Sequence, residues 1–110
     1  MKQYVIDELR PADYDLLKNY LDAHYIADAL DGIYWIPVPD ELLTGIQAAH
    51  SDCRPHYFSV ELFDGRMSCE LLVRTKKRVR CDCMGYADEK QRTWLIETVD
   101  AVLDQLGIQI

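Results

Sequence analysis

Residues 56–74 read HYFSVELFDGRMSCELLVR, and this stretch decides the fold. Asp64-Gly65 separates two runs in which apolar and polar residues alternate, which is the pattern of a two-residue β-hairpin. Such a loop pairs Phe63 with Arg66, and all further pairs follow from that one. Paired residues share a face of the sheet. The hairpin therefore has one face for a core and a second, open face.

The predicted pairs continue as Leu62–Met67, Val60–Cys69, Phe58–Leu71 and His56–Val73. The core face then collects His56, Phe58, Val60, Leu62, Met67, Cys69, Leu71 and Val73. The open face carries Tyr57, Ser59, Glu61, Phe63, Arg66, Ser68, Glu70, Leu72 and Arg74.

A third strand is expected after a turn at residues 75–77. An odd-length loop places Val79, Cys81 and Cys83 on the core face, with Cys81 opposite Leu71 and Cys83 opposite Cys69. An even loop would bury Arg80 and Asp82, which is costly for unpaired charges. We therefore expect the odd loop.

Helical patterns surround this sheet. Pro11 and the acids after it predict a first helix, with a buried stripe of Leu17, Tyr20, Leu21 and His24. Residues 33–36 predict a short strand, and residues 39–50 predict a second helix with Leu42, Leu43, Ile46 and Ala49 on its apolar side. Asp88 predicts the N-cap of a last helix that ends near Leu106, with Gly107 after it. Ile108 and Ile110 are expected to pack against the body. The result is a two-layer α+β domain, in which helices pack on one face of an antiparallel meander of three to four strands.

Composition limits the class of protein. A chain of 110 residues, 49% hydrophobic and 28% charged, predicts one globular domain over residues 1–110. It lacks a run of ~20 apolar residues for a membrane helix. Acids near the N-terminus argue against export, so we expect a cytoplasmic protein with four free cysteines. The net charge of −7 makes nucleic-acid binding unlikely.

Cysteine and histidine residues form the set most suggestive of chemistry. The chain contains Cys81-Asp82-Cys83 and His50-x-x-Cys53-x-x-His56. On a straight strand, side chains two positions apart are separated by roughly 6.5 Å, so the first pair would not converge easily on one ion. We therefore predict small core cysteines, without a metal or cofactor. The alternative is a metal- or thiol-dependent protein that uses His50, Cys53, His56, Cys69, Cys81 and Cys83.

Finer expectations concern single side chains in this set. Cys69 and Cys83 would be the pair that forms under oxidation, and Cys53 would be the exposed, reactive thiol. His24, His50 and His56 are interpreted as structural: partly buried on a helix, in a last helical turn, and at the edge of the core. Nucleophile, phosphate-loop and zincin motifs do not occur, so an enzyme is not favoured.

Two surfaces remain for binding. Residues 74–80 contain five basic residues in seven, at the tip of the predicted meander. The open face combines aromatic side chains with arginine, types that are common at protein interfaces. We expect a non-enzymatic interaction module that binds a protein partner or itself, with nucleic-acid binding through residues 74–80 as a weaker alternative. The binding residues would be Tyr57, Phe63, Arg66, Leu72, Arg74, Lys76, Lys77, Arg78, Arg80 and Tyr86.

Overall fold

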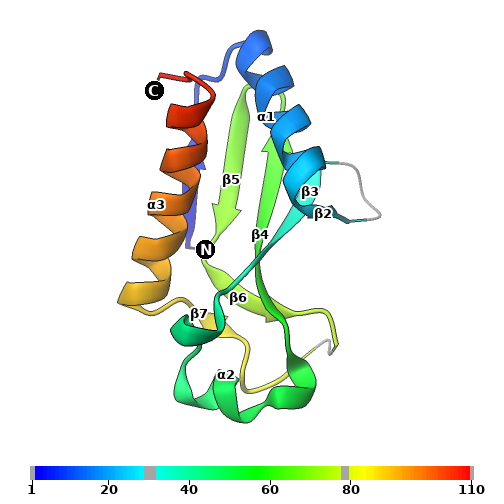
Figure 1. Cartoon of the computed structure of the whole chain (residues 1–110), viewed down its shortest axis with the longest axis vertical. Helices are drawn as coiled ribbons and strands as arrows, with labels where there is room; N and C mark the ends of the chain where they lie inside the picture. The colour runs from blue at the N-terminus through cyan, green and yellow to red at the C-terminus, as the bar shows by residue number, and fades with distance from the viewer. Residues whose placement is uncertain (1, 29–31, 78–79, 110) are drawn as a thin grey trace.

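The longest strand, β4 (His56–Phe63), lies at the centre of an antiparallel sheet that is covered on one face by two helices (Figure 1). The computed structural model describes residues 2–28, 32–77 and 80–109. Its strands are β1 (Gln3–Ile6), β2 (Ile26–Ala27), β3 (Ile33–Pro37), β4, β5 (Arg66–Glu70), β6 (Leu72–Thr75) and β7 (Gly85–Tyr86). The main order is β1-β5-β4-β3-β2, so the predicted α+β class with helices on an antiparallel sheet is confirmed.

The hairpin forms around Asp64-Gly65, and the pairs next to its turn are the predicted ones. Phe63 pairs with Arg66, and Val60 with Cys69. Gly65 has a φ of +87°, a left-handed conformation that costs glycine little. This agreement follows from the short loop, which leaves only one register for the first four pairs.

The predicted register fails beyond Cys69. His56 pairs with Thr75 instead of Val73, because the chain leaves the ladder at Leu71. The Leu71 N–H donates to the Lys2 carbonyl, and its own carbonyl accepts from Ala87. The shift is by two residues, which preserves the face of every side chain. The expected core face therefore survives, with Val73 and Thr75 both buried.

The predicted third strand through Cys81 and Cys83 is wrong. After β6 the chain makes a turn at Cys81–Met84, where the Met84 N–H donates to the Cys81 carbonyl, and only Gly85–Tyr86 returns to pair with β6. The place beside β5 is taken by β1, which the sequence pattern did not reveal. Val79 and Arg78 lie outside the described residues. Arg80 and Asp82 are exposed and Cys83 is buried, as expected, but not on a strand.

Two long helices form the second layer. Helix α1 (Pro11–His24) buries Leu17 and Leu21, and α3 (Glu89–Gln105) buries Leu95, Val99 and Leu103. Asp88 is the N-cap of α3: its carboxylate Oδ1 accepts a hydrogen bond from the Gln91 N–H at 2.9 Å. Ile108 packs into the core as expected, whereas Ile110 is outside the described residues. His24 is exposed and stacks on Tyr20, so its predicted partial burial is wrong.

The prediction of one continuous second helix is wrong, because residues 39–50 form two short helical segments. These are the 3-10 turn η1 (Asp40–Leu42) and the helix α2 (Gly45–Ala49). Thr44 and Gln47 form a capping box, which starts a new helix at Gly45. This restart turns Ile46 outward, at 55% exposure, and turns Gln47 inward, at 3%.

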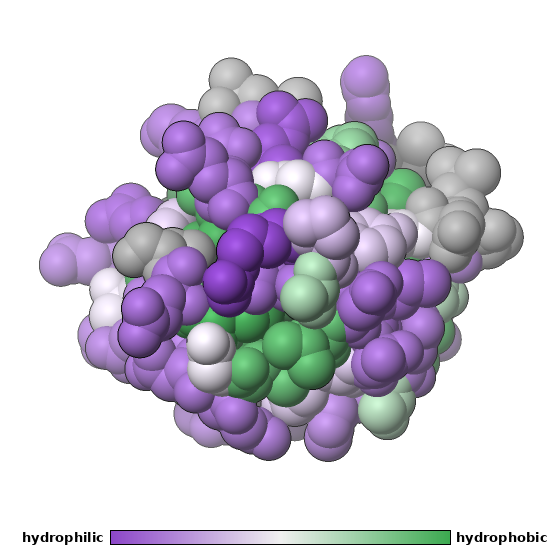
Figure 2. Space-filling model, turned by 90° about the horizontal axis from the view of Figure 1, so that it is seen from above, coloured by the Kyte–Doolittle hydropathy of each residue, from purple (hydrophilic) through white to green (hydrophobic). Residues whose placement is uncertain are grey.

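The core lies between the helices and the inner face of the sheet. Its fully buried members include Phe58, Leu17 and Leu95. Seen from the end of the molecule at the top of Figure 1, a hydrophobic area is surrounded by hydrophilic side chains (Figure 2). Among the described helices, none is long and apolar enough to cross a membrane.

Candidate metal centre

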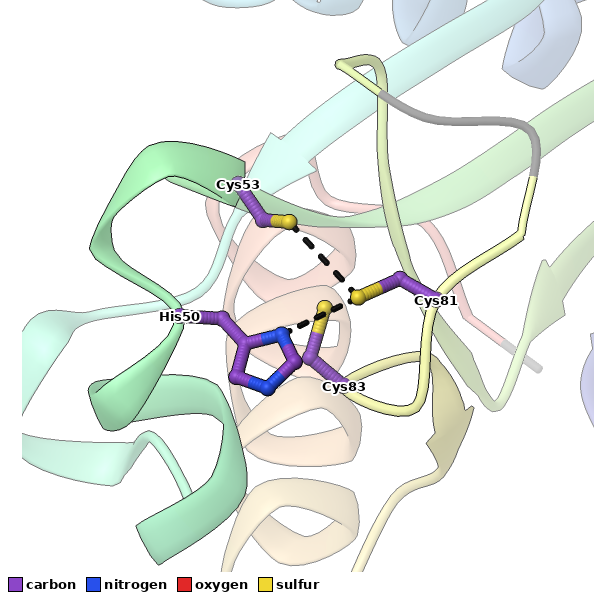
Figure 3. A group of neighbouring side chains, drawn as sticks. All are labelled: His50, Cys53, Cys81 and Cys83. Carbon is purple, nitrogen blue, oxygen red and sulfur yellow. Dashed lines mark hydrogen bonds between the residues drawn. The ribbon is translucent and has the colours of Figure 1, made fainter.

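Four side chains from two distant parts of the chain converge on one point (Figure 3), next to α2 at the lower end of the view in Figure 1. They are His50, Cys53, Cys81 and Cys83, and their ligand atoms all lie within 4.8 Å of one another. Cys53 and Cys83 are buried, while His50 and Cys81 are partly exposed. The site therefore has a buried half and a half that faces a surface groove lined by Ala49, His50, Asp52, Cys53 and Cys81.

The first pair of side chains comes from the end of α2. His50 is the C-cap of α2 and also precedes the 3-10 turn η2 (Ser51–Cys53). The Cys53 N–H donates to the His50 carbonyl at 2.9 Å, which closes this turn. One tight turn thus brings His50 and Cys53 to the same side. His50 caps the end of α2 and does not lie in its last turn, where the sequence placed it.

The second pair comes from the turn that replaces the predicted third strand. On a strand, Cys81 and Cys83 would stand apart along one face, which was the reason to discount a metal. The turn at Cys81–Met84 curls the backbone instead, so both sulfur atoms point toward His50 and Cys53 (Figure 3). The strand geometry that argued against a shared ion is therefore absent at Cys81 and Cys83.

The separations suit a tetrahedral ion. Cys53 and Cys81 have their sulfur atoms 3.7 Å apart, and His50 Nδ1 lies 3.0 Å from Cys81 Sγ. A zinc–sulfur bond of about 2.3 Å gives sulfur–sulfur edges of about 3.8 Å, and sulfur–nitrogen edges of about 3.6 Å. Small side-chain rotations would therefore be enough to place all four ligand atoms around one ion.

The thiols of the cluster differ in acidity. The pKa of Cys81 is lowered to about 7, first by a hydrogen bond from the Cys83 backbone and then by its side-chain contacts with Cys83, His50 and Cys53. Burial raises the pKa of Cys83 and of Cys53. Cys81 is thus the thiol that most readily supplies a thiolate, the form that binds metals.

Buried polar contacts hold the backbone of the two buried cysteines. Thr75 Oγ1 donates to the Cys53 carbonyl at 2.5 Å, and Gln47 Nε2 donates to the Cys83 carbonyl at 3.2 Å. Neither Gln47 nor Thr75 was predicted as a site residue. The only sequence signal was the Thr44–Gln47 capping spacing, which indicates a helix start and gives no information on a metal.

Two of the predicted metal-ligand candidates lie outside the cluster. Cys69 is on β5 between Tyr4 and Val60, fully buried, so it does not face Cys83 and the predicted oxidised pair is wrong. His56 is 1% exposed, and neither ring nitrogen has a hydrogen-bond partner among the described residues. Burial, then Arg54 and His50, lowers its pKa. Cys53 is 1% exposed, so its predicted exposure is wrong as well.

Of the predicted binding residues, Phe63 and Arg66 pair as expected, whereas Tyr57 pairs with Arg74 and is buried, at 8% exposure, so its predicted open position is wrong. Cations sit over aromatic rings: Arg66 over Phe63, with the guanidinium carbon 4.6 Å from the ring centre, and Lys76 over Tyr57 at 5.5 Å. Arg74 is paired with Glu70 at 2.6 Å. Lys77 and Arg80 are exposed, Leu72 is half-buried and Tyr86 is 50% exposed. Arg78 lies outside the described residues.

Comparisons with known proteins give no match: protein-family models, curated proteins and solved structures all fail to align significantly with this chain.

Proposed function

We propose that this protein is a zinc-binding domain whose ion is held by His50, Cys53, Cys81 and Cys83. The observation that carries the proposal is the convergence of three thiols and one imidazole within 4.8 Å from two separate turns. Three cysteines and one histidine form a common ligand set of structural zinc sites. Soft thiolates favour zinc over magnesium or calcium, which prefer oxygen ligands.

The role of the ion would be structural. Four protein ligands complete a tetrahedron and leave no position for a substrate, unlike a catalytic site with three ligands and a water. The ion would join the α2–η2 segment to the turn at Cys81–Met84, in addition to the bond from Gln47 to the Cys83 carbonyl. Binding would fix the end of the basic segment 74–80, because Cys81 directly follows it.

Cobalt substitution tests this proposal. Co²⁺ added to the metal-free protein should give thiolate-to-cobalt charge transfer and the intense visible bands of a tetrahedral ion, saturating at one equivalent. Excess Zn²⁺ should then bleach both signals. A weak spectrum without charge transfer would overturn the proposal, because it would show that the thiols do not bind the ion.

A second candidate function is a protein-interaction module, as the sequence suggests. The observation that favours it is the series of rings with nearby cations on the open face: Lys76 also lies 5.3 Å from the Trp35 ring centre, and Lys2 lies 5.4 Å from that of Tyr86. Tryptophan, tyrosine and arginine, which occur together on this face as Trp35, Tyr86 and Arg66, are the types that most often dominate binding energy. Sedimentation should detect a self-associated species that Phe63→Glu weakens. A strict monomer at all concentrations would count against self-association.

A further inference from the structure

Buried amide groups connect Cys83 to the first turn of α3. Gln47 Nε2 donates to the Cys83 carbonyl, and Gln91 Nε2 donates to Gln47 Oε1 at 2.8 Å. Gln91 Oε1 in turn accepts from the Asp88 backbone N–H at 3.2 Å. Gln47 and Gln91 are 3% and 0% exposed. A continuous series of hydrogen bonds thus leads from a candidate metal ligand to the N-cap of a helix.

Each polar atom of the two amides has a partner. Gln47 Oε1 also accepts from the Thr44 N–H at 3.0 Å, and Gln91 Nε2 also donates to the Leu42 carbonyl at 2.9 Å. Loss of one member of a buried network leaves the remaining polar atoms without a hydrogen-bond partner from water or protein, which costs free energy. A disturbance at either glutamine should therefore pass to the other, and from there to Cys83.

The position of Gln47 gives this pair a role at the site. Its amide holds the carbonyl of Cys83 itself, so it restrains the backbone that directs the Cys83 sulfur. Groups that orient metal ligands in this way set how well the ligands are placed before the ion arrives. Gln91 cannot contact the ion, but it fixes Gln47 by the hydrogen bond to its Oε1.

We propose that Gln47 and Gln91 are positioning residues of the zinc centre, and that zinc binding and the first turn of α3 stabilise each other through them. This inference rests on the proposed zinc function. Coupling between two sites is reciprocal in binding free energy. If Gln91 improves zinc affinity, zinc must improve the order of the turn that contains Gln91.

The test compares zinc affinity in three variants, by competition with a chromophoric chelator. Gln47→Met and Gln91→Met keep similar volume without the amide, and each should lower zinc affinity by about tenfold. Val99→Ala is the matched control, because it removes buried side-chain volume in the middle of α3, where Val99 is 3% exposed, but leaves the first turn and the two glutamines in place. Its zinc affinity should stay within about twofold of the original.

Hydrogen exchange on the unsubstituted protein gives a second readout. The backbone N–H of Gln91, which donates to Asp88 Oδ1, should exchange about tenfold more slowly with zinc than without it, by the same coupling. This measurement decides the question even if the methionine variants do not fold. No slowing at this amide in the zinc-loaded protein would overturn the inference.

The outcomes separate the two proposals. If the original protein binds zinc but both methionine variants bind it equally well, the positioning role is overturned and the zinc function stands. The role is also overturned if Val99→Ala weakens zinc binding as much as Gln91→Met, because a general loss of helix stability would then explain both. If the original protein does not bind zinc, the proposed function fails first.

Discussion

The sulfur atom of Cys53 lies 3.7 Å from that of Cys81, although 28 residues separate the two in the chain. One belongs to the turn after α2, and the other follows the basic segment. Two thiols at this distance are as far apart as neighbouring ligands of one zinc ion. Free, unligated cysteines in a core are usually dispersed small hydrophobes, as Cys69 is here.

Substitution of a cysteine in the cluster should lower zinc affinity, whereas substitution of Cys69, which lies outside it, should not. Cys83→Ser replaces a thiolate by a poor zinc ligand, so we expect zinc affinity to fall by a factor on the order of 100 or more. Cys69→Ala should leave the affinity unchanged, and cost about 1–2 kcal/mol of folding stability for a small core truncation. Chelator competition and denaturant unfolding measure the two quantities. Equal zinc affinity in Cys83→Ser would exclude Cys83 as a ligand.

Zinc should stabilise the fold by mass action. An ion that binds only the native state adds about 2.7 kcal/mol at a free concentration 100 times its dissociation constant. Urea unfolding with buffered zinc, and again with excess chelator, measures this difference. In Cys81→Ser the two curves should nearly coincide. A difference that persists in that variant would mean that zinc stabilises the protein at another place.

Cys81 should be the first thiol to be alkylated in the metal-free protein. It is partly exposed and its pKa is lowered to about 7, so about half of this thiol is ionised at pH 7. Cys69 is fully buried, and burial raises its pKa to about 12, so it should react only after unfolding. Iodoacetamide labelling followed by peptide mapping tests the order. Zinc should protect Cys81, and faster labelling of Cys69 would contradict the structure.

The hairpin and the long helices could be predicted because their signals are local. Asp64-Gly65 permits one register close to the turn, and the apolar stripe of α3 repeats over many turns between Asp88 and Gly107. The face of the sheet on which each strand residue lies could also be predicted, because the register shift at Leu71 is two residues and leaves the faces unchanged. These features depend on residues that are near one another in the chain.

The candidate site could not be predicted because it depends on distant contacts. The backbone of Leu71 bonds to Lys2 and Ala87, which interrupts the pairing between β4 and the strand after the hairpin turn. Cys81 and Cys83 then lie in a turn. Alternation of Val79, Cys81 and Cys83 imitates a strand, and only the competition from β1 for the edge of β5 shows otherwise. Gln47 was assigned to no role, since the helix was expected to start before Thr44 and not at Gly45.

Alkaline pH should weaken the contact between β1 and α3. Tyr4 donates its hydroxyl to Asp100 Oδ1 at 2.6 Å, and burial, followed by this bond, raises the pKa of Tyr4 from 10.0 to about 12. A raised pKa means that the stabilisation is complete below pH 10 and is lost as the pH rises toward 12. The pKa values of Tyr25 and Tyr34 are raised as well, so the tyrosinate absorbance of Tyr4→Phe should show one late-titrating group fewer than that of the original protein. An unchanged titration curve in Tyr4→Phe would contradict the contact.

Native mass spectrometry of the untagged protein tests the zinc centre most directly. The protein should carry one zinc ion per chain, seen as the mass of zinc less the protons that its ligands release. Treatment with a chelator should remove this mass, and one equivalent of Zn²⁺ should restore it. A folded protein that stays at the bare chain mass after zinc addition would contradict the account, because four converging ligands would then bind nothing.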